Sequence, residues 1–330
     1  MLTSSLFAIL PDYVVTPDSM TIHPTGGDLV LSCPNYANES LPGCVVRIDT
    51  AGNVRKWFDT PCHPETGVAR NMGIEFGPDG TLYLCDNQGW SGTPEFAFKG
   101  RMLAVYADDD GTILDEHTVA RDMQHPNGVR VRGNYMYVTQ SVMTKVHDPS
   151  GLMASAVYRF ALDDRDIHVT NTLDDPNIIA TFLTHHPITQ YGADGIAFGP
   201  DGALYVGNFG DGTVYRITFD ADGNATSNEP WASNPDQLAS TDGMIFDAHG
   251  NLYIADFSVN AIGKIAPDKT VTRIAQSPDT DGLHGELNQP GEVIVWDGRI
   301  IASCFNLVTG PDKVNTGHTL PATLAQLPLA

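Results

Sequence analysis

The stretch Gly73–Asn87, GIEFGPDGTLYLCDN, decides the fold of this chain because close copies of it recur, GIAFGPDGALYVGNF from Gly195 and GMIFDAHGNLYIADF from Gly243. Each copy reads as a short apolar strand, a tight turn and a second apolar strand. In the turn GPDG, proline presets φ, aspartate accepts local backbone hydrogen bonds and glycine tolerates positive φ. The chain therefore contains an internal repeat.

Three more divergent copies complete the series. They read MTIHPTGGDLVLSCPN from Met20, GVRVRGNYMYVTQ from Gly128 and EVIVWDGRIIASCFN from Glu292. Equivalent residues recur at intervals of roughly 48 to 67 residues, which is typical of propeller blades of four strands each. Helical periodicity is absent. The sequence predicts an all-β fold, a six-bladed β-propeller with four-stranded blades, as a single domain over residues 1–330.

Further strands are expected outside each repeated pair. Third strands are predicted at Gly43–Ile48, Met102–Ala107, Val157–Phe160, Val214–Thr218 and Ile262–Ile265, with outer strands such as Val54–Phe58 and Val271–Ala275. The sixth copy lacks a convincing fourth strand after Thr319–Leu327. We expect an N-terminal segment, Leu6–Leu10 or Tyr13–Thr16, to supply it, so that the two ends of the chain close the ring and remove an open sheet edge.

The connections between second and third strands are long in four repeats, whereas the turns between first and second strands are all tight. The long connections are approximately Pro34–Pro42, Asn87–Gly100, Ser141–Ala156 and Asn306–His318. Strand alternation places them on the face where the inner strands begin. A scaffold with one plain face and one elaborated face predicts a site on the elaborated face.

One residue near the start of each inner strand holds an equivalent place, and we call these the marker residues. They are Asp18, Met72, Asn127, Asp194, Asp242 and Glu292, with the sixth position ambiguous between Gly291 and Glu292. Inner strands converge at the mouth of the central channel, so four oxygen-bearing side chains face one point. Hard cations such as Ca²⁺ require such ligands. Asn-Gly and Asp-Gly are also ordinary turn dipeptides, and spacing alone leaves that structural interpretation equally open.

The whole-chain charge limits the classes of partner. A net charge of −22 disfavours nucleic acid and anionic membrane surfaces, because both are polyanions. The five cysteines form no C-x-x-C pair and leave one unpaired, which fits a reducing compartment. Neither a signal peptide nor a transmembrane stretch is evident, so a cytoplasmic location is expected. Serine-hydrolase elbows and zincin motifs are absent.

The repeats, the PDG turns and the ordered series Asp18, Asn127-Gly128, Asp194-Gly195 and Asp242-Gly243 resemble the gluconolactonase and regucalcin (senescence marker protein) family, and more distantly paraoxonases and diisopropylfluorophosphatase. Members of that family are six-bladed propellers that bind one divalent cation through a Glu of the first blade, two Asn of the third and fourth, and an Asp of the fifth. The resemblance implies that Asp18 stands for the Glu, Asn127 and Asp194 for the two Asn, and Asp242 for the Asp.

Two departures from the family pattern matter. Asp18 is one methylene shorter than Glu, and Asp194 replaces an amide by a carboxylate, which makes the site more anionic. The resemblance implies a single divalent cation, Ca²⁺ before Zn²⁺, Mg²⁺, Mn²⁺ or Fe²⁺. It also implies a lactonase that opens a sugar or small aliphatic lactone, the small-molecule partner of the protein. The cation would polarise the carbonyl, and Asp242 would act as general base or nucleophile, with Asp194 as its rival.

Other candidates concern the pocket and the alternatives to a lactonase. Met72, Tyr191 and Glu292 are expected to line the pocket. His125, two residues before Asn127, is either a proton-transfer group at the rim or a solvent-facing loop histidine, and Trp90 is a lid or, as we favour, a loop anchor. A phosphotriesterase-like hydrolase and a non-catalytic propeller that binds a cation or a partner remain alternatives, because fold alone does not fix function.

Overall fold

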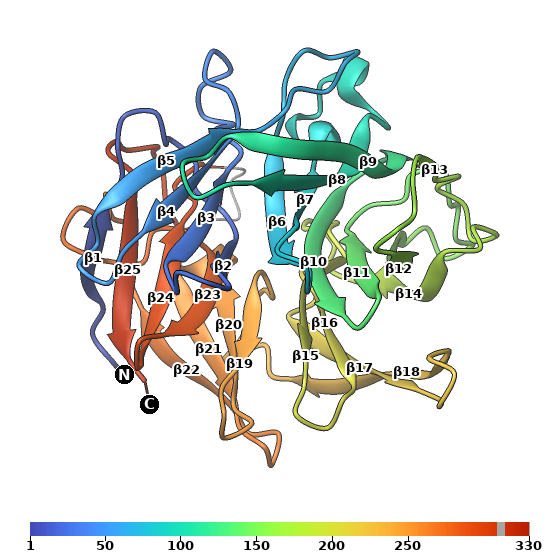
Figure 1. Cartoon of the computed structure of the whole chain (residues 1–330). Helices are drawn as coiled ribbons and strands as arrows, with labels where there is room; N and C mark the ends of the chain where they lie inside the picture. Colours follow the sequence, from blue (N-terminus) through green and yellow to red (C-terminus); the bar gives the residue numbers. More distant parts are fainter. Residues whose placement is uncertain (309–313, 330) are drawn as a thin grey trace.

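The computed structural model describes residues 1–308 and 314–329, which form a ring of six small antiparallel sheets around a central axis (Figure 1). The part of the long connection Asn306–His318 between residues 309 and 313 lies outside the described residues. The six-bladed β-propeller predicted from the repeats is confirmed. Each blade alternates apolar strands with Gly- and Asp-containing turns, so its two faces pack against the neighbouring blades.

The first three blades follow the repeat closely. Blade 1 contains β2 (Met20–Ile22), β3 (Leu29–Cys33), β4 (Cys44–Ile48) and β5 (Val54–Asp59). Blade 2 contains β6 (Asn71–Phe76), β7 (Leu82–Asp86), β8 (Gly100–Ala107) and β9 (Ile113–Met123). Blade 3 contains β10 (Pro126–Arg132), β11 (Tyr135–Gln140), β12 (Met153–Ala161) and β14 (Ile178–Thr184). The two-residue strand β13 (Ile167–His168) adds to blade 2 in parallel with β9, a fifth strand that the repeat did not predict.

The remaining blades complete the ring. Blade 4 contains β15 (Ala193–Phe198), β16 (Leu204–Asn208), β17 (Thr213–Phe219) and β18 (Ala225–Ser233). Blade 5 contains β19 (Met244–Phe246), β20 (Leu252–Asp256), β21 (Ala261–Ile265) and β22 (Val271–Gln276). Blade 6 contains β23 (Pro290–Trp296), β24 (Arg299–Cys304), β25 (Thr323–Pro328) and β1 (Ser5–Ile9). Three short 3₁₀ helices occur in the described residues, η1 (Gln88–Ser91), η2 (Pro94–Phe96) and η3 (Phe257–Val259).

The ring closes through the two ends of the chain. The N-terminal strand β1 pairs antiparallel with the C-terminal strand β25, and the termini lie close together (Figure 1). Of the two N-terminal segments considered from the sequence, the first supplies the strand. Phe7 of β1 packs edge-on against Trp296 of β23, with ring centroids 5.9 Å apart. Closure thus combines backbone pairing with apolar packing.

The core lies between adjacent blades rather than at one centre. Buried side chains of neighbouring sheets form successive clusters around the ring, one of them joining Leu31 of blade 1 to Ile301 of blade 6. This arrangement leaves the axis itself for the polar side chains of the inner strands. No helix within the described ranges is long and apolar enough to cross a membrane.

Candidate functional site

The marker residues project into the channel because the inner strands are irregular at their first residues. Asn127 follows Pro126 in β10, where the pairing with β11 shifts register, and Asp194 lies at the same point of β15. Met72 occupies the corresponding irregularity of β6. A β-bulge leaves a residue unpaired and re-aims its side chain. The bulge therefore turns these side chains toward the axis.

The glycine after each marker residue permits the inner strands to approach one another. A Cβ built on Gly128 would lie 2.7 Å from the carbonyl oxygen of Asp194, and one on Gly195 would overlap the carbonyl oxygen of Asp242. The glycines of the Asn-Gly and Asp-Gly dipeptides therefore serve close packing around the axis rather than turns between blades. The alternative that these dipeptides are ordinary turns is wrong at these positions.

In the sixth blade, Gly291 rather than Glu292 holds the marker position. The Glu292 N–H donates to the Ser303 hydroxyl at 3.0 Å, as the Ser19 N–H of blade 1 donates to the Ser32 hydroxyl at 3.1 Å. Glu292 thus corresponds to the residue after the marker. Its carboxyl nevertheless reaches the channel mouth, because it occupies the space that a side chain at position 243 would need.

The structure brings four predicted side chains together. Asp18, Asn127, Asp194 and Asp242 line one small cavity with Glu292 beside them. The cavity volume is about 20 Å³, which is close to the space of one water-sized particle. Asp18 and Asp194 are each 5% exposed and are nearly withdrawn from bulk solvent, whereas Asp242 is partly exposed.

The contacts within this carboxyl cluster are direct. The Asn127 amide nitrogen donates to Asp194 Oδ1 at 2.6 Å. The Gly243 N–H donates to Asp242 Oδ1 at 3.0 Å and fixes the orientation of that carboxyl. Neighbouring carboxylates repel each other, so a proton or a cation between them stabilises the cluster.

Burial and mutual repulsion disfavour ionisation of the carboxyls in the cluster. Burial, followed by the nearby Glu292 carboxyl, raises the pKa of Asp18 to about 8. Burial and the Asp18 carboxyl raise the pKa of Asp194 well above its ordinary range, and burial and Asp194 do the same for the pKa of Asp242. A positive charge at this point would reverse these shifts.

Glu292 is held by its own partners. The Ser19 hydroxyl donates to Glu292 Oε2 at 2.9 Å, and Arg130 Nη2 lies 3.5 Å from the same oxygen. Arg130, buried in the channel behind the cluster, also lies 3.9 Å from Glu75 Oε2. Burial raises the pKa of Glu292 while Arg130 and Ser19 oppose that effect. Arg130 and Ser19 were not among the residues predicted from the sequence, although a buried-strand position held by the charged Arg130 in the quoted repeat was a usable signal.

The donor set fits a hard divalent cation in chemistry, although the side chains contact one another in this structure. Among the described residues, no three His, Cys, Asp or Glu side chains form a ready coordination shell. Asn127 presents its amide nitrogen to Asp194. Rotating that amide by about 180° would present its oxygen instead, since the two atoms exchange places. Three carboxyls and one amide oxygen match the preference of Ca²⁺ and Mg²⁺ for oxygen.

His125 is buried rather than solvent-facing, so the loop-surface alternative is wrong. It is 5% exposed, and burial lowers its pKa to about 4. The Asn87 amide nitrogen lies 3.1 Å from His125 Nδ1, and Asn87 Oδ1 accepts from the Trp90 N–H. Because the amide nitrogen can only donate, Nδ1 is the acceptor and the proton of the neutral ring lies on Nε2. His125 can therefore donate a hydrogen bond from Nε2 at neutral pH.

Aromatic rings surround the mouth above the cluster, and we call them the aromatic collar. Five of its members follow the second strands of blades 1, 2, 4, 5 and 6, namely Tyr36, Trp90, Phe209, Phe257 and Phe305. The sixth, Tyr191, precedes β15. Trp90 packs on Tyr36 with ring centroids 4.2 Å apart, and its capped N–H anchors the loop as favoured from the sequence. Trp90 and Tyr191 were candidates from the sequence, whereas the other four members of the collar were not predicted.

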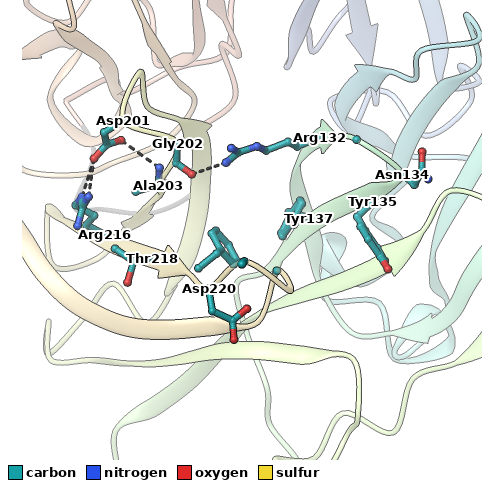
Figure 2. A pocket seen from close by; sticks show the side chains of 14 residues that line it. Arg132, Asn134, Tyr135, Tyr137, Asp201, Gly202, Ala203, Arg216, Thr218 and Asp220 are labelled. Carbon is teal, nitrogen blue, oxygen red and sulfur yellow. Dashed lines mark hydrogen bonds and ion pairs between the residues drawn. The ribbon is translucent and has the colours of Figure 1, made fainter.

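A separate hollow opens between blades 3 and 4, on the face of the tight turns (Figure 2). Its volume is about 580 Å³. Its charged groups already have partners, since Arg216 pairs with Asp201 at 2.7 Å and Arg132 donates to the Gly202 carbonyl. It lies at the opposite ends of the inner strands from the marker residues. The larger hollow is therefore not the site that the marker residues build.

Comparison with solved structures supports the fold. Solved structures with the same fold include a gluconolactonase from Xanthomonas campestris, with a TM-score of 0.60 and 17% identity over 98% of this chain and 89% of that one. The calcium-binding protein regucalcin from Agrobacterium tumefaciens matches with a TM-score of 0.61 and 13% identity over 99% and 93% of the two chains.

Propellers with other chemistry match equally well. Virginiamycin B lyase from Staphylococcus aureus gives a TM-score of 0.59 and 13% identity, with full coverage of both chains. No curated protein matches the sequence significantly. Residues 186–282, which include Asp194 and Asp242, match the family model described as SMP-30/Gluconolactonase/LRE-like region. The chain thus carries an SMP-30/gluconolactonase/LRE-like region within a six-bladed propeller, which confirms the resemblance indicated by its repeats and marker residues.

Proposed function

We propose that this protein is a lactonase-type hydrolase that opens a cyclic carboxylic ester at the carboxyl cluster with the help of one divalent cation. The observation that carries the proposal is the convergence of Asp18, Asn127, Asp194 and Asp242 on a cavity of about 20 Å³. The family match over residues 186–282 supports it, because the match covers two of these four side chains.

The cation would be held by Asp194, Asp242 and the Asn127 amide oxygen, with Asp18 as a further ligand, either direct or through water. When bound, it would supply a positive charge beside the substrate carbonyl and oppose the raised pKa values of the carboxyls. Every carboxyl of the cluster then becomes available in its ionised form. The pKa of Asp18, about 8 without such a charge, would fall together with the raised pKa values of Asp194 and Asp242.

Asp242 is the proposed general base. Asp194 is 5% exposed, whereas Asp242 is partly exposed, and its carboxyl is oriented by a backbone donor, the Gly243 N–H. Asp242 would accept a proton from water as the water oxygen bonds to the carbonyl carbon. The ring C–O bond then breaks, and the proton passes to the departing alkoxide oxygen. The products are a hydroxycarboxylate and one proton released at neutral pH.

His125 is suited to a supporting role. Its Nε2–H, fixed by the acceptor role of Nδ1 toward Asn87, can donate to an oxygen of the substrate near the mouth. Because the His125 pKa is lowered to about 4, the ring is neutral throughout the working range of a hydrolase. We therefore propose that His125 donates a hydrogen bond to the substrate and does not accept the proton of the attacking water.

The test is metal-dependent proton release on a panel of lactones. We expect ring opening with Ca²⁺, Mg²⁺, Mn²⁺ or Zn²⁺ added, loss of activity in excess chelator, and recovery when the cation is restored. Paraoxon, a phosphotriester, is assayed in parallel. Binding of a cation without turnover of any ester would refute the hydrolase proposal, and faster turnover of the phosphotriester than of every lactone would assign the site to the alternative hydrolase.

A further inference from the structure

The aromatic collar forms a nearly continuous wall around the channel mouth. Ring-centroid distances run from Tyr191 to Phe209 at 6.3 Å, from Phe209 to Phe257 at 5.9 Å and from Phe257 to Phe305 at 5.6 Å. Phe305 continues to Trp90 at 5.4 Å. These spacings are those of interacting aromatic rings. Phe209, Phe257 and Phe305 are 2 to 7% exposed, so the accessible surface of this wall belongs to the partly exposed rings of Tyr36, Trp90 and Tyr191.

This wall adjoins the carboxyl cluster directly. Met72, the marker residue of blade 2, packs within the collar although its equivalents line the cavity. A Cβ built on Gly291 would lie 3.1 Å from Asp18 Oδ1 and 3.7 Å from Phe305 Cβ, so carboxyl and ring flank the same glycine. Burial and the nearby Asp18 carboxyl raise the pKa of Tyr36 well above its ordinary range. A substrate that reaches the cluster from this face therefore touches the collar.

The polar groups of the collar are mostly engaged. The Tyr36 hydroxyl donates to the Asn87 carbonyl at 2.6 Å. The Asn87 amide group contacts His125, the Trp90 N–H and the Met72 sulfur. A sugar lactone carries hydroxyls around its ring, and each hydroxyl buried against carbon without a partner loses its hydrogen bonds to water. The collar therefore disfavours such a substrate.

We propose that the substrate is a lactone bearing an apolar alkyl or aryl substituent, with the ester carbonyl at the carboxyl cluster and the substituent against the aromatic collar. The inference rests on the proposed lactonase function and selects the substrate class within it, an apolar lactone rather than a polyhydroxylated sugar lactone. Each methylene removed from water against the rings should raise kcat/KM about three- to fourfold until the collar is filled.

The experiment compares lactones of one ring size at saturating cation. The panel contains glucono-δ-lactone, δ-valerolactone, and δ-lactones with propyl, pentyl and heptyl substituents on the ring carbon that bears the ester oxygen. We expect kcat/KM to rise with chain length and to exceed that of glucono-δ-lactone by at least tenfold for the pentyl compound. Preferred turnover of glucono-δ-lactone would overturn the substrate class while sustaining the lactonase function. Turnover of no lactone would refute the lactonase function and this inference with it.

Two variants of the aromatic collar test whether its rings cause the increase in kcat/KM with substituent length. Tyr191 is 37% exposed, so Tyr191→Ala should fold normally, and Phe257→Leu keeps apolar volume in a more buried position. Tyr191→Ala should reduce the increase in kcat/KM per methylene by lowering affinity, seen as a higher KM with little change in kcat. Phe246→Ala, at the other end of the channel, is the control and should retain the increase. Phe257→Leu should also retain the increase because the position stays apolar, and an unchanged chain-length dependence in Tyr191→Ala would overturn the assignment.

Discussion

Replacing Asp18 with asparagine should stabilise the protein when divalent cations are removed. Asp18 is 5% exposed and faces Glu292, and these two effects, burial first, raise its pKa from the ordinary 3.8 to about 8. A carboxyl with a raised pKa in the folded state favours folding most below its unfolded pKa, and this advantage is lost as pH rises toward the folded pKa. The amide introduced by Asp18→Asn would have the shape of the protonated acid at every pH.

The magnitude follows from the same two pKa values. At pH 8 the buried Asp18 carboxyl costs on the order of 5 kcal/mol of folding free energy, and at pH 5 about 2 kcal/mol. An unfolding entropy of roughly 2 cal/mol/K per residue over 330 residues converts these into a rise in Tm of about 7 °C at pH 8 and about 3 °C at pH 5. The gain should therefore more than double between the two pH values.

Differential scanning calorimetry in excess chelator measures the change in Tm at both pH values. The control is Asp236→Asn, which also removes one negative charge but from an exposed residue far from the site. Adding Ca²⁺ at pH 8 should stabilise the parent protein more than Asp18→Asn, because the cation offsets the repulsion that the variant lacks. If, in excess chelator at pH 8, the Tm of Asp18→Asn were lower than that of the parent protein, the Asp18 carboxyl would stabilise the fold without a cation. The electrostatic reasoning would then be wrong.

Three further outcomes are expected. At saturating cation, Asp242→Asn should lower kcat about 10²- to 10⁴-fold with an unchanged circular dichroism spectrum, and a near-parental rate there with an inactive Asp194→Asn would move the base to Asp194. Gly195→Ala should lower the free energy of unfolding by about 3 kcal/mol in urea titrations, whereas Gly317→Ala, which has open space, should have little effect; equal effects would contradict the close-packing role. Deleting residues 1–9 should lower Tm by several degrees by removing β1 from blade 6, and an unchanged Tm would show that ring closure does not depend on it.

The repeats predicted the ring because each one encodes a complete local unit. The apolar pair of strands and the GPDG turn at Gly77–Gly80 fix pairing and register within about 15 residues, so no distant contact has to be known. The same logic located Asn127 and Asp194 on the axis. It could not place Glu292, because the bulge of β23 is one residue shorter and the equivalence becomes visible only through the hydrogen bond to Ser303.

The aromatic collar and Arg130 escaped prediction for a different physical reason. Phe209 and Phe257 are the last residues of two quoted copies of the repeat, where a phenyl ring is as well explained by ordinary packing as by a binding wall. Their role becomes visible only in the closed propeller, which brings these two side chains, about fifty positions apart, into contact with ring centroids 5.9 Å apart. Arg130 likewise acquires its role from Glu292, which lies three blades away and at 3.5 Å.

The two levels of the mouth arise from two positions of one repeated unit. The marker residue at or just before the inner strand supplies the carboxyls, and the residue directly after the second strand supplies Phe209, Phe257 and Phe305. Because the inner strands surround the axis, the carboxyls meet around a cavity of about 20 Å³, and the rings pack in a separate cluster above it. Substitution at either position leaves the apolar strand pair untouched. Substitutions at the two positions are therefore expected to change reaction chemistry and substrate preference independently.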